Sequence, residues 1–242
     1  MRRPPWQDAA WWQFGLRWGI TGDRHGAGSR EMTLDAHFFI DNSNVFGGAQ
    51  LASEKLEPGS VRKSVRIYYK NLFKLIENGF NPVTRVLAGS LPPGNESLWE
   101  HARGLGYDPD LLKRVAKDDG RLVEQGVDEI VHLKIANVIL DYDAPQALVL
   151  VTGDGNEADF GTSFLQQVKR ALKHGWHVHV WSWEEQQSNK YARLAEETDG
   201  VLVVHQFDPY YKSLTFLQEG DYSVEGDTVH VSARVVGKLK FD

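Results

Sequence analysis

Aspartates follow two apolar segments of the chain and open a third, which is a pattern expected for a divalent-metal centre. Residues 36–40 run into Asp41-Asn42-Ser43-Asn44, and residues 147–151, the most apolar run, precede Thr152-Gly153-Asp154-Gly155-Asn156-Glu157-Ala158-Asp159-Phe160. The third segment is Gly126-Val127-Asp128-Glu129. Clustered carboxylates repel one another without a cation, and Mg²⁺ and Mn²⁺ prefer oxygen ligands. Metal-assisted chemistry is therefore expected.

Strands and helices alternate along the chain, which predicts the frame that holds these acids. The expected strands are 36–40, 83–88, 147–151, 176–181 and 201–204, and the expected helices are 61–76, 95–105, 127–139, 164–172 and 188–196. This order predicts an α/β fold, a three-layer α/β/α sandwich with a mainly parallel, Rossmann-like central sheet, plus a short C-terminal β extension. Ligands of such sheets bind outside the carboxyl ends of the strands, where the acids are expected to meet.

Each acid alone has an ordinary structural explanation. Asp41 and Asn44 could cap the turn after their strand, and Asp128 could be a helix-start acid favoured by the macrodipole. Asp154 and Asp159 lie in a glycine-rich loop, where turn formation is common. The hypothesis of a metal centre rests on the joint placement of these residues.

The acidic segments resemble the NYN domain, a branch of the PIN-like nucleases, over roughly residues 35–208. Asp41 to Asn44 is similar to the D-x-x-N motif of that family, Gly126 to Asp128 to its G-V-D motif, and Gly153-Asp154 with Asp159-Phe160 to its G-D-x-D-F motif. The resemblance implies hydrolysis of RNA phosphodiester bonds with one or two Mg²⁺ or Mn²⁺ ions. It also implies the catalytic and metal-binding residues, which are Asp41, Asp128, Asp154 and Asp159.

Two positions depart from the family pattern. Three extra residues separate Asp154 from Asp159, and one of them is Glu157, so either Glu157 or Asp159 is the fourth metal ligand. Many relatives carry another aspartate where this chain has Lys134. We expect Asp159 to be the ligand because Phe160 follows it, as in the family motif.

An RNA substrate of an acidic protein needs local positive charge. The net charge is −6, from 27 basic and 33 acidic residues. The substrate-binding residues expected from the resemblance and from their position are Ser43, Asn44, Lys70, Lys190 and Arg193. Lys190 and Arg193 are the stronger candidates among the basic residues, because their helix begins at the same edge of the sheet. The ordinary alternative is that these charges lie on solvated helix faces.

Three other functions compete with a nuclease. Residues 153–158 match G-x-G-x-x-A, the dinucleotide-binding pattern, but Asp154 and Glu157 would place negative charge beside a pyrophosphate. His174, His177 and His179 suggest a zinc site, although alternation along a strand explains the last two as residues of one sheet face. The main alternative is an RNA-binding or protein-assembly module that keeps the fold without catalysis.

Composition limits the remaining possibilities. The chain has 242 residues and no cysteine, which excludes disulfides, thiolate metal sites and cysteine nucleophiles. No apolar run approaches the roughly 18–20 residues of a membrane span, so an intracellular, cytoplasmic protein is expected. Residues 1–33 hold four of the eight tryptophans and are expected to be a loosely ordered segment that could contact a second copy or another protein. Residues 34–210 form the expected nuclease domain, and residues 211–242 the C-terminal extension, with a hairpin at Glu225-Gly226-Asp227.

Overall fold

A parallel sheet forms the centre of the molecule in a computed structural model, which describes residues 33–90, 96–112, 115–116, 122–123, 127–155 and 163–241. Within these ranges the sheet contains six strands in the order β4-β3-β1-β7-β8-β9. The strands are β1 (Leu34–Asp41), β3 (Phe80–Ser90), β4 (Asp108–Leu112), β7 (Ala147–Val151), β8 (His177–Ser182) and β9 (Leu202–Gln206). Every neighbouring pair in the sheet is parallel. The predicted α/β fold class is confirmed.

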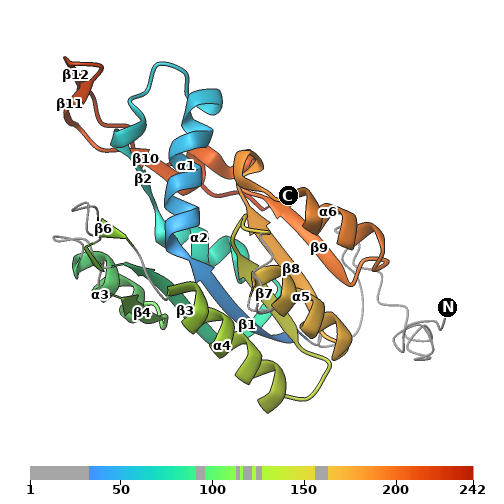
Figure 1. The fold of residues 1–242 in the computed structure, drawn as a ribbon. Helices are drawn as coiled ribbons and strands as arrows, with labels where there is room; N and C mark the ends of the chain where they lie inside the picture. Colours follow the sequence, from blue (N-terminus) through green and yellow to red (C-terminus); the bar gives the residue numbers. More distant parts are fainter. Residues whose placement is uncertain are drawn as a thin grey trace, which may run out of the picture.

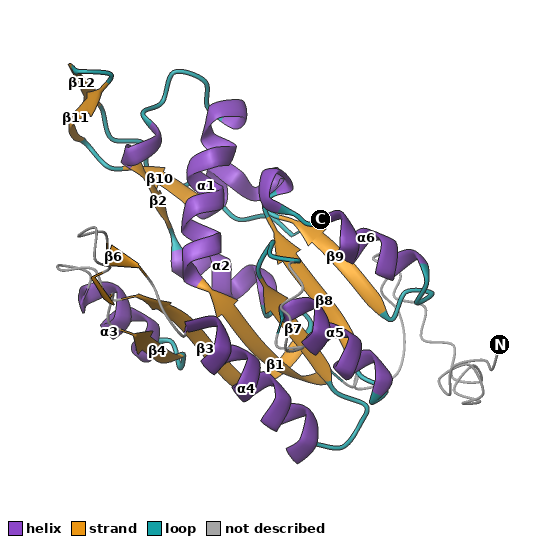
Figure 2. Cartoon of the chain, viewed as in Figure 1, coloured by secondary structure: helices purple, strands orange, loops and turns teal. Residues whose placement is uncertain are grey.

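Helices cover both faces of the sheet, so that the molecule has three layers (Figures 1 and 2). One hydrophobic cluster joins the sheet to helices α1 (Asn42–Leu56), α2 (Tyr69–Ile76), α3 (Glu96–Gly104) and α7 (Tyr211–Leu214). A second cluster joins the opposite face to α4 (Val127–Asp141), α5 (Phe164–Lys173) and α6 (Asn189–Glu196). The residues of β7 are all buried because the strand lies between the two clusters.

The chain between residues 42 and 76 differs from the sequence prediction. The predicted helix over 61–76 is wrong in its first half, which forms a 3₁₀ turn (Arg62–Ser64) and the strand β2 (Val65–Ile67). β2 pairs with β10 (Thr215–Leu217), whose residues lie far along the chain. Val65 and Ile67 fit strand as well as helix spacing, and only the distant partner decides between the two. Helix α1, which follows Asp41 directly, was not expected.

The C-terminal part of the chain contains the predicted hairpin. β11 (Gly220–Val224) and β12 (Asp227–Val231) pair antiparallel across Glu225 and Gly226. Both turn residues have positive φ, 52° and 97°, as two-residue hairpin loops require. A two-stranded ribbon, β5 (Val115–Ala116) with β6 (Leu122–Val123), lies apart from the main sheet.

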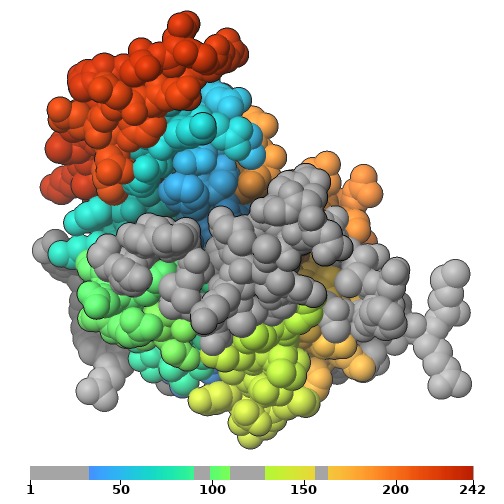
Figure 3. Space-filling model, turned by 60° about the vertical axis from the view of Figure 1, so that its left-hand side comes forward, coloured from blue at the N-terminus to red at the C-terminus, as the bar shows by residue number. Residues whose placement is uncertain are grey.

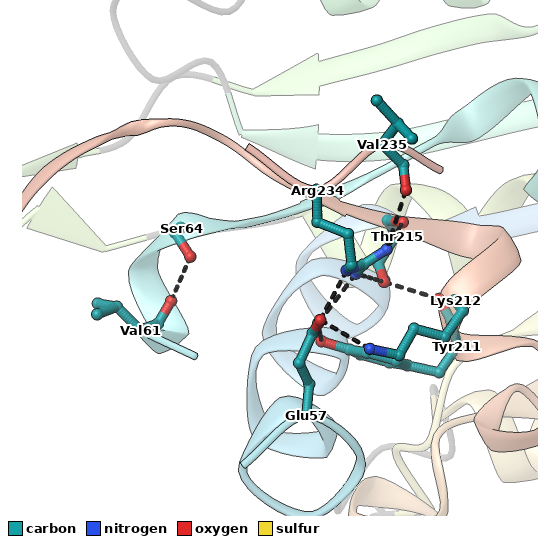
Figure 4. A network of polar contacts seen from close by, with 8 residues as sticks. All are labelled: Glu57, Val61, Ser64, Tyr211, Lys212, Thr215, Arg234 and Val235. Carbon is teal, nitrogen blue, oxygen red and sulfur yellow. Dashed lines mark hydrogen bonds and ion pairs between the residues drawn. The ribbon is translucent and has the colours of Figure 1, made fainter. Parts of the chain in front are cut away.

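The segment after the hairpin returns to the body of the protein and is held there by polar contacts to Glu57, the C-cap of α1 (Figure 4). The Glu57 carboxylate accepts hydrogen bonds from Tyr211 Oη at 3.0 Å and Lys212 Nζ at 2.7 Å, and it pairs with Arg234 at 2.7 Å. Arg234 also donates to the Thr215 carbonyl oxygen at 2.8 Å. Tyr211 and Leu214 are buried in the same cluster as α1. Residues 211–217 thus pack within the main core, and the red C-terminal residues lie against α1 and the segment that follows it (Figure 3).

Candidate functional site

The two aspartates that follow β1 and β7 lie at the point where the strand order reverses. Counted along the chain, the sheet order is 3-2-1-4-5-6, and β1 and β7 are the neighbouring strands from which the two halves run outward. Asp41 is the last residue of β1, and Thr152 to Gly155 follow β7 directly. The carboxyl edge at such a reversal is the usual ligand site of an open α/β sheet. The predicted meeting of these segments at one edge is observed.

Asp41 is the N-cap of α1 as well as a residue of this edge. Its Oδ1 accepts a hydrogen bond from Asn44 N at 3.1 Å, and its Oδ2 accepts one from Thr152 Oγ1 at 3.4 Å. The side chain is mostly buried, with 9% of the residue exposed. The positive end of the helix dipole favours a carboxylate at this position. The capping role considered from the sequence is therefore real, and it holds the carboxylate in a defined orientation.

Asn44 braces the neighbouring loop. Its Oδ1 accepts a hydrogen bond from Gly153 N at 2.8 Å, which ties the start of α1 to the end of β7. Asp154 N in turn donates to Thr152 Oγ1 at 3.2 Å, and Tyr191 Oη donates to the Asp154 carbonyl oxygen at 2.5 Å. Burial raises the pKa of the Tyr191 phenol, and the Asp154 charge acts in the same direction, so Tyr191 stays protonated as a donor. The side chains of Asn44, Thr152 and Tyr191 thus hydrogen-bond the backbone of Gly153 and Asp154 and hold it in place.

The segment after β8 closes the other side of the site. Ser188 N donates to the Gly153 carbonyl oxygen at 3.0 Å. A Cβ atom at Gly153 would lie 2.3 Å from the Gln186 carbonyl oxygen, and one at Gly155 would lie 2.2 Å from Ser188 Oγ. Glycines at these two positions are needed because another part of the chain lies against them.

Together these segments line an open hollow of about 530 Å³. Its lining residues are Asp41, Ser43, Asn44, Gly153, Asp154, Gly155, Gln186 and Ser188. Four of the predicted site residues, Asp41, Ser43, Asn44 and Asp154, are thus brought together. Sequence reasoning missed Gln186 and Ser188, although the predicted start of a helix at Ser188 placed that residue at the same edge.

The predicted basic residues lie outside this lining. Lys190 Cβ lies 3.8 Å from where a Cβ at Gly155 would be, so Lys190 stands beside the hollow at the start of α6. Arg193 is exposed about one turn further along the same helix. Lys70 is exposed on α2, directly after Tyr69, whose hydroxyl donates to Asn42 Oδ1 next to Asp41. Lys190 is therefore the basic residue with the clearest connection to the site.

Three further predicted acids, Asp128, Glu157 and Asp159, have side chains outside the described part of the structure. Glu157 and Asp159 lie outside the described residues, and the backbone of Asp128 lies in the first turn of α4. Lys134 forms an ion pair with Asp108 at 3.3 Å. Within the described parts of the chain, no three His, Asp or Glu side chains gather closely enough to hold a metal ion. The donors that do line the hollow are carboxylate, amide and hydroxyl oxygens, which suit Mg²⁺ or Mn²⁺.

The residues behind the competing functions have structural roles. His177 and His179 share one face of β8, as predicted, and His179 Nδ1 lies 2.9 Å from His205 Nε2. Trp183 is buried and donates to the Val45 carbonyl oxygen at 2.9 Å, so this tryptophan has a packing role. Gly153 and Gly155 are the two glycines of the dinucleotide-like pattern, and both lie against the segment that follows β8. Their contacts with Gln186 and Ser188 explain both glycines without a cofactor.

Comparison with known proteins finds similarity to solved structures and none to a family model or a curated protein. No family model matches the chain. No curated protein matches it either. A solved structure of a Vibrio parahaemolyticus protein of unknown function is similar with a TM-score of 0.49 and 17% sequence identity, over 73% of this chain and 96% of that one. Among the described residues, no helix is long and apolar enough to cross a membrane.

Proposed function

We propose that the protein is a metal-dependent ribonuclease that hydrolyses RNA phosphodiester bonds in the hollow at the carboxyl edge of β1 and β7. The observation that supports this proposal is the placement of Asp41 and Asp154 on one hollow at the reversal of strand order. The oxygen donors that line it match the preference of Mg²⁺ and Mn²⁺. Asp41 and Asp154 would hold the metal, together with Asp128 and either Asp159 or Glu157.

Several described residues in and beside the hollow would have a task in this reaction. Bound Mg²⁺ or Mn²⁺ supplies an activated water and stabilises the charge on the leaving oxygen. Asp41 is oriented by Asn44 N and Thr152 Oγ1, so its position is preorganised. Ser43 and Ser188 present hydroxyl groups that can hydrogen-bond a phosphate in the hollow. Lys190 adds positive charge beside the hollow, which an RNA backbone requires on a protein of net charge −6.

An RNA-binding module without catalysis is the second candidate, and Lys134 favours it. The ion pair of Lys134 with Asp108 gives this position a structural task where relatives carry an acid. In that case the hollow would bind RNA and leave it intact. The experiment below separates the two candidates.

Replacing single carboxylates by amides tests the proposal. Labelled RNAs are incubated with the full chain and Mn²⁺, Mg²⁺ or EDTA, and Asp41→Asn and Asp154→Asn are compared with the wild type. Each variant should lower cleavage by orders of magnitude, because metal-based charge stabilisation contributes several kcal/mol. Asparagine is also a good N-cap, so Asp41→Asn should keep α1 intact. Binding of RNA should persist, because a charge that repels a polyanion is removed.

The matched control is Asp143→Asn, the same change at an exposed turn after α4. It should cleave RNA like the wild type. If the Asp41 and Asp154 variants also cleave like the wild type, the activity has another origin. A wild type that binds RNA but cuts none with either metal would establish the binding module instead.

A further inference from the structure

Two phenylalanines and an arginine lie beside one another near the hollow, although three distant parts of the chain supply them. Phe46 lies on α1 about one turn after Ser43, which lines the hollow, and residues three apart share a helix face. The Arg66 guanidinium carbon lies 6.0 Å from the centre of the Phe46 ring. Phe216 is directly opposite Arg66 in the β2–β10 pair, so these two side chains lie on the same face of that ribbon. Phe46, Arg66 and Phe216, here called the platform, extend from the hollow along the side of α1 where β2 lies (Figure 1).

The platform is the outer face of a ribbon whose inner face belongs to the core. Val65 and Ile67, on the two sides of Arg66 in β2, are buried in the same cluster as α1. Alternation along the strand turns Arg66 the other way. All three platform residues remain partly exposed. Their rings and charge are therefore within reach of a ligand, while the backbone beneath them is fixed by the core.

The platform lies on a basic stretch of an acidic protein. Residues 58–76 contain five Lys or Arg residues and no Asp or Glu, in a chain of net charge −6. Arg66 donates to the Lys63 carbonyl oxygen at 2.6 Å, which orients its guanidinium. Among the described residues it pairs with no carboxylate, whereas the neighbouring Arg62 pairs with Glu54 at 3.5 Å. The charge of Arg66 is thus oriented and not neutralised, so it can bind an anion.

A cation beside aromatic rings suits a single strand of nucleic acid, because unpaired bases stack on the rings and phosphates bind the cation. We propose that the platform binds the RNA strand where it leaves the hollow, with bases stacked on Phe46 and Phe216 and a phosphate paired with Arg66. The proposal rests on the proposed function, because it takes RNA as the ligand of the hollow. Binding of this kind should accept any base, since every base has a flat face for stacking.

Binding measured without metal tests the platform separately from cleavage. The full chain is titrated in EDTA into a labelled oligouridine of about 12 nucleotides, and fluorescence anisotropy gives the dissociation constant. Phe46→Leu and Phe216→Leu should each weaken binding by about 5-fold or more, because leucine keeps the apolar packing but offers no ring for stacking. An RNA duplex of the same length has its bases already stacked. Both variants should therefore bind the duplex like the wild type.

The salt dependence of the affinity tests Arg66. The oligouridine titration is repeated at increasing concentrations of KCl. Arg66→Gln should reduce the slope of log affinity against log salt by about 0.7, the value for one phosphate contact on a single strand. Arg66→Lys should keep the slope because the charge remains, and the two phenylalanine variants should keep it because stacking releases no counterions. A purely structural role would leave the slope unchanged in every variant.

The matched controls are Lys173→Gln and Phe241→Leu. Lys173 is exposed at the end of α5, which covers the opposite face of the sheet, and Phe241 is 51% exposed near the C-terminus. Both controls should bind both RNAs with the affinity and the slope of the wild type. Circular dichroism checks the fold of each variant. Arg66→Gln, at a partly exposed position, decides the question if a phenylalanine variant does not fold.

Two results would overturn the platform and leave the proposed function intact when the wild type still cleaves RNA. They are phenylalanine variants that bind oligouridine like the wild type, and an Arg66→Gln variant that keeps the full slope. An equal loss of affinity for the duplex in the phenylalanine variants would overturn base stacking. If the variants lose affinity as expected but the wild type cuts no RNA with either metal, the platform stands and the nuclease does not. A wild type that binds no oligouridine overturns the platform.

Discussion

Two glycines allow the segment after β7 to lie directly against the segment after β8. The space for a side chain at Gly153 is filled by the carbonyl of Gln186, and that at Gly155 by Ser188. These contacts form one wall of the hollow. The shape of the site thus requires glycine at positions 153 and 155, where a Cβ atom would collide with Gln186 or Ser188.

Gly153→Ala should destabilise the protein by about 1–3 kcal/mol, because a backbone carbonyl 2.3 Å from the new Cβ must move. Chemical denaturation of both proteins measures the change in the free energy of unfolding. Gly104→Ala is the control, since a Cβ there meets nothing within 4 Å. It should leave the stability unchanged or raise it slightly. Equal stabilities for the two variants would contradict the close approach.

His179 and His205 form a partly buried pair whose protonation should contribute to the acid sensitivity of the fold. Burial lowers the pKa of His179 to about 3, with further lowering by His205 and His177, and burial lowers the pKa of His205 to about 4. In the unfolded chain both histidines titrate near pH 6.5. As the pH falls below 6.5, the unfolded state gains protons that the folded state does not. Each histidine should then lower the free energy of unfolding by up to about 1.4 kcal/mol per pH unit, until its folded pKa is reached.

Urea unfolding between pH 8 and pH 5 measures this slope. The double variant His179→Phe with His205→Phe should show a flatter profile than the wild type, because two titrating groups are gone. His174→Gln, at an exposed position, should keep the slope of the wild type. A double variant with the slope of the wild type would exclude the pair as its source.

At the scale of elements, the end of α1 is joined to the C-terminal segment by one carboxylate. Glu57 is mostly buried, with 13% of its side chain exposed, and it contacts Tyr211, Lys212 and Arg234 (Figure 4). Burial raises the pKa of Glu57, but hydrogen bonds from Lys212 and Arg234 outweigh this effect and leave the pKa below its usual value. The contribution of Glu57 to stability is therefore present above about pH 4.5 and is lost at lower pH.

Glu57→Gln should lower the free energy of unfolding at pH 7 by about 2 kcal/mol or more, because Arg234 would be left partly buried without its counter-charge. Limited proteolysis should then cut within residues 218–241 before the rest of the chain. The control is Glu54→Gln, whose carboxylate is 64% exposed and pairs with Arg62 at 3.5 Å. An exposed pair contributes little, so this variant should change stability by less than about 1 kcal/mol.

At the scale of the whole molecule, the two ends of the chain should differ in how much they contribute to folding. Residues 1–32 precede β1 and lie outside the described structure, and their sequence lacks the periodicity of the core. A protein that lacks them should fold and bind metal. A protein that ends at residue 210 should not fold, because Tyr211, Leu214 and β10 belong to the main cluster and to the pair with β2.

Circular dichroism and thermal melting of the two truncated proteins check this contrast. A cooperative melt is expected for the protein without residues 1–32 and none for the one without residues 211–242. An unfolded N-terminal truncation would place the tryptophan-rich segment in the core. A stable C-terminal truncation would show that residues 211–217 are dispensable.

Periodicity and composition alone predicted most of the architecture. Buried runs such as residues 147–151 predict central strands, because a strand covered on both faces has no polar side. The amphipathic pattern of residues 164–172 predicts α5 for a similar reason. The acids that follow the strands could be assigned to the carboxyl edge, since parallel strands all end there. Asp41 and Asp154 were assigned to this edge by this reasoning, and in the structure they line one hollow with Ser43 and Asn44.

Contacts between distant segments decided those parts of the structure that short sequence patterns could not predict. Residues 65–67 form a strand because β10 pairs with them, and pairing between distant segments leaves no trace in local periodicity. Gln186 and Ser188 reach the hollow because the segment after β8 lies against Gly153 and Gly155. His132 is likewise buried against Phe164 because α4 packs against α5. Sequence determines which groups face an edge or a core, whereas contacts across the fold determine which of them meet.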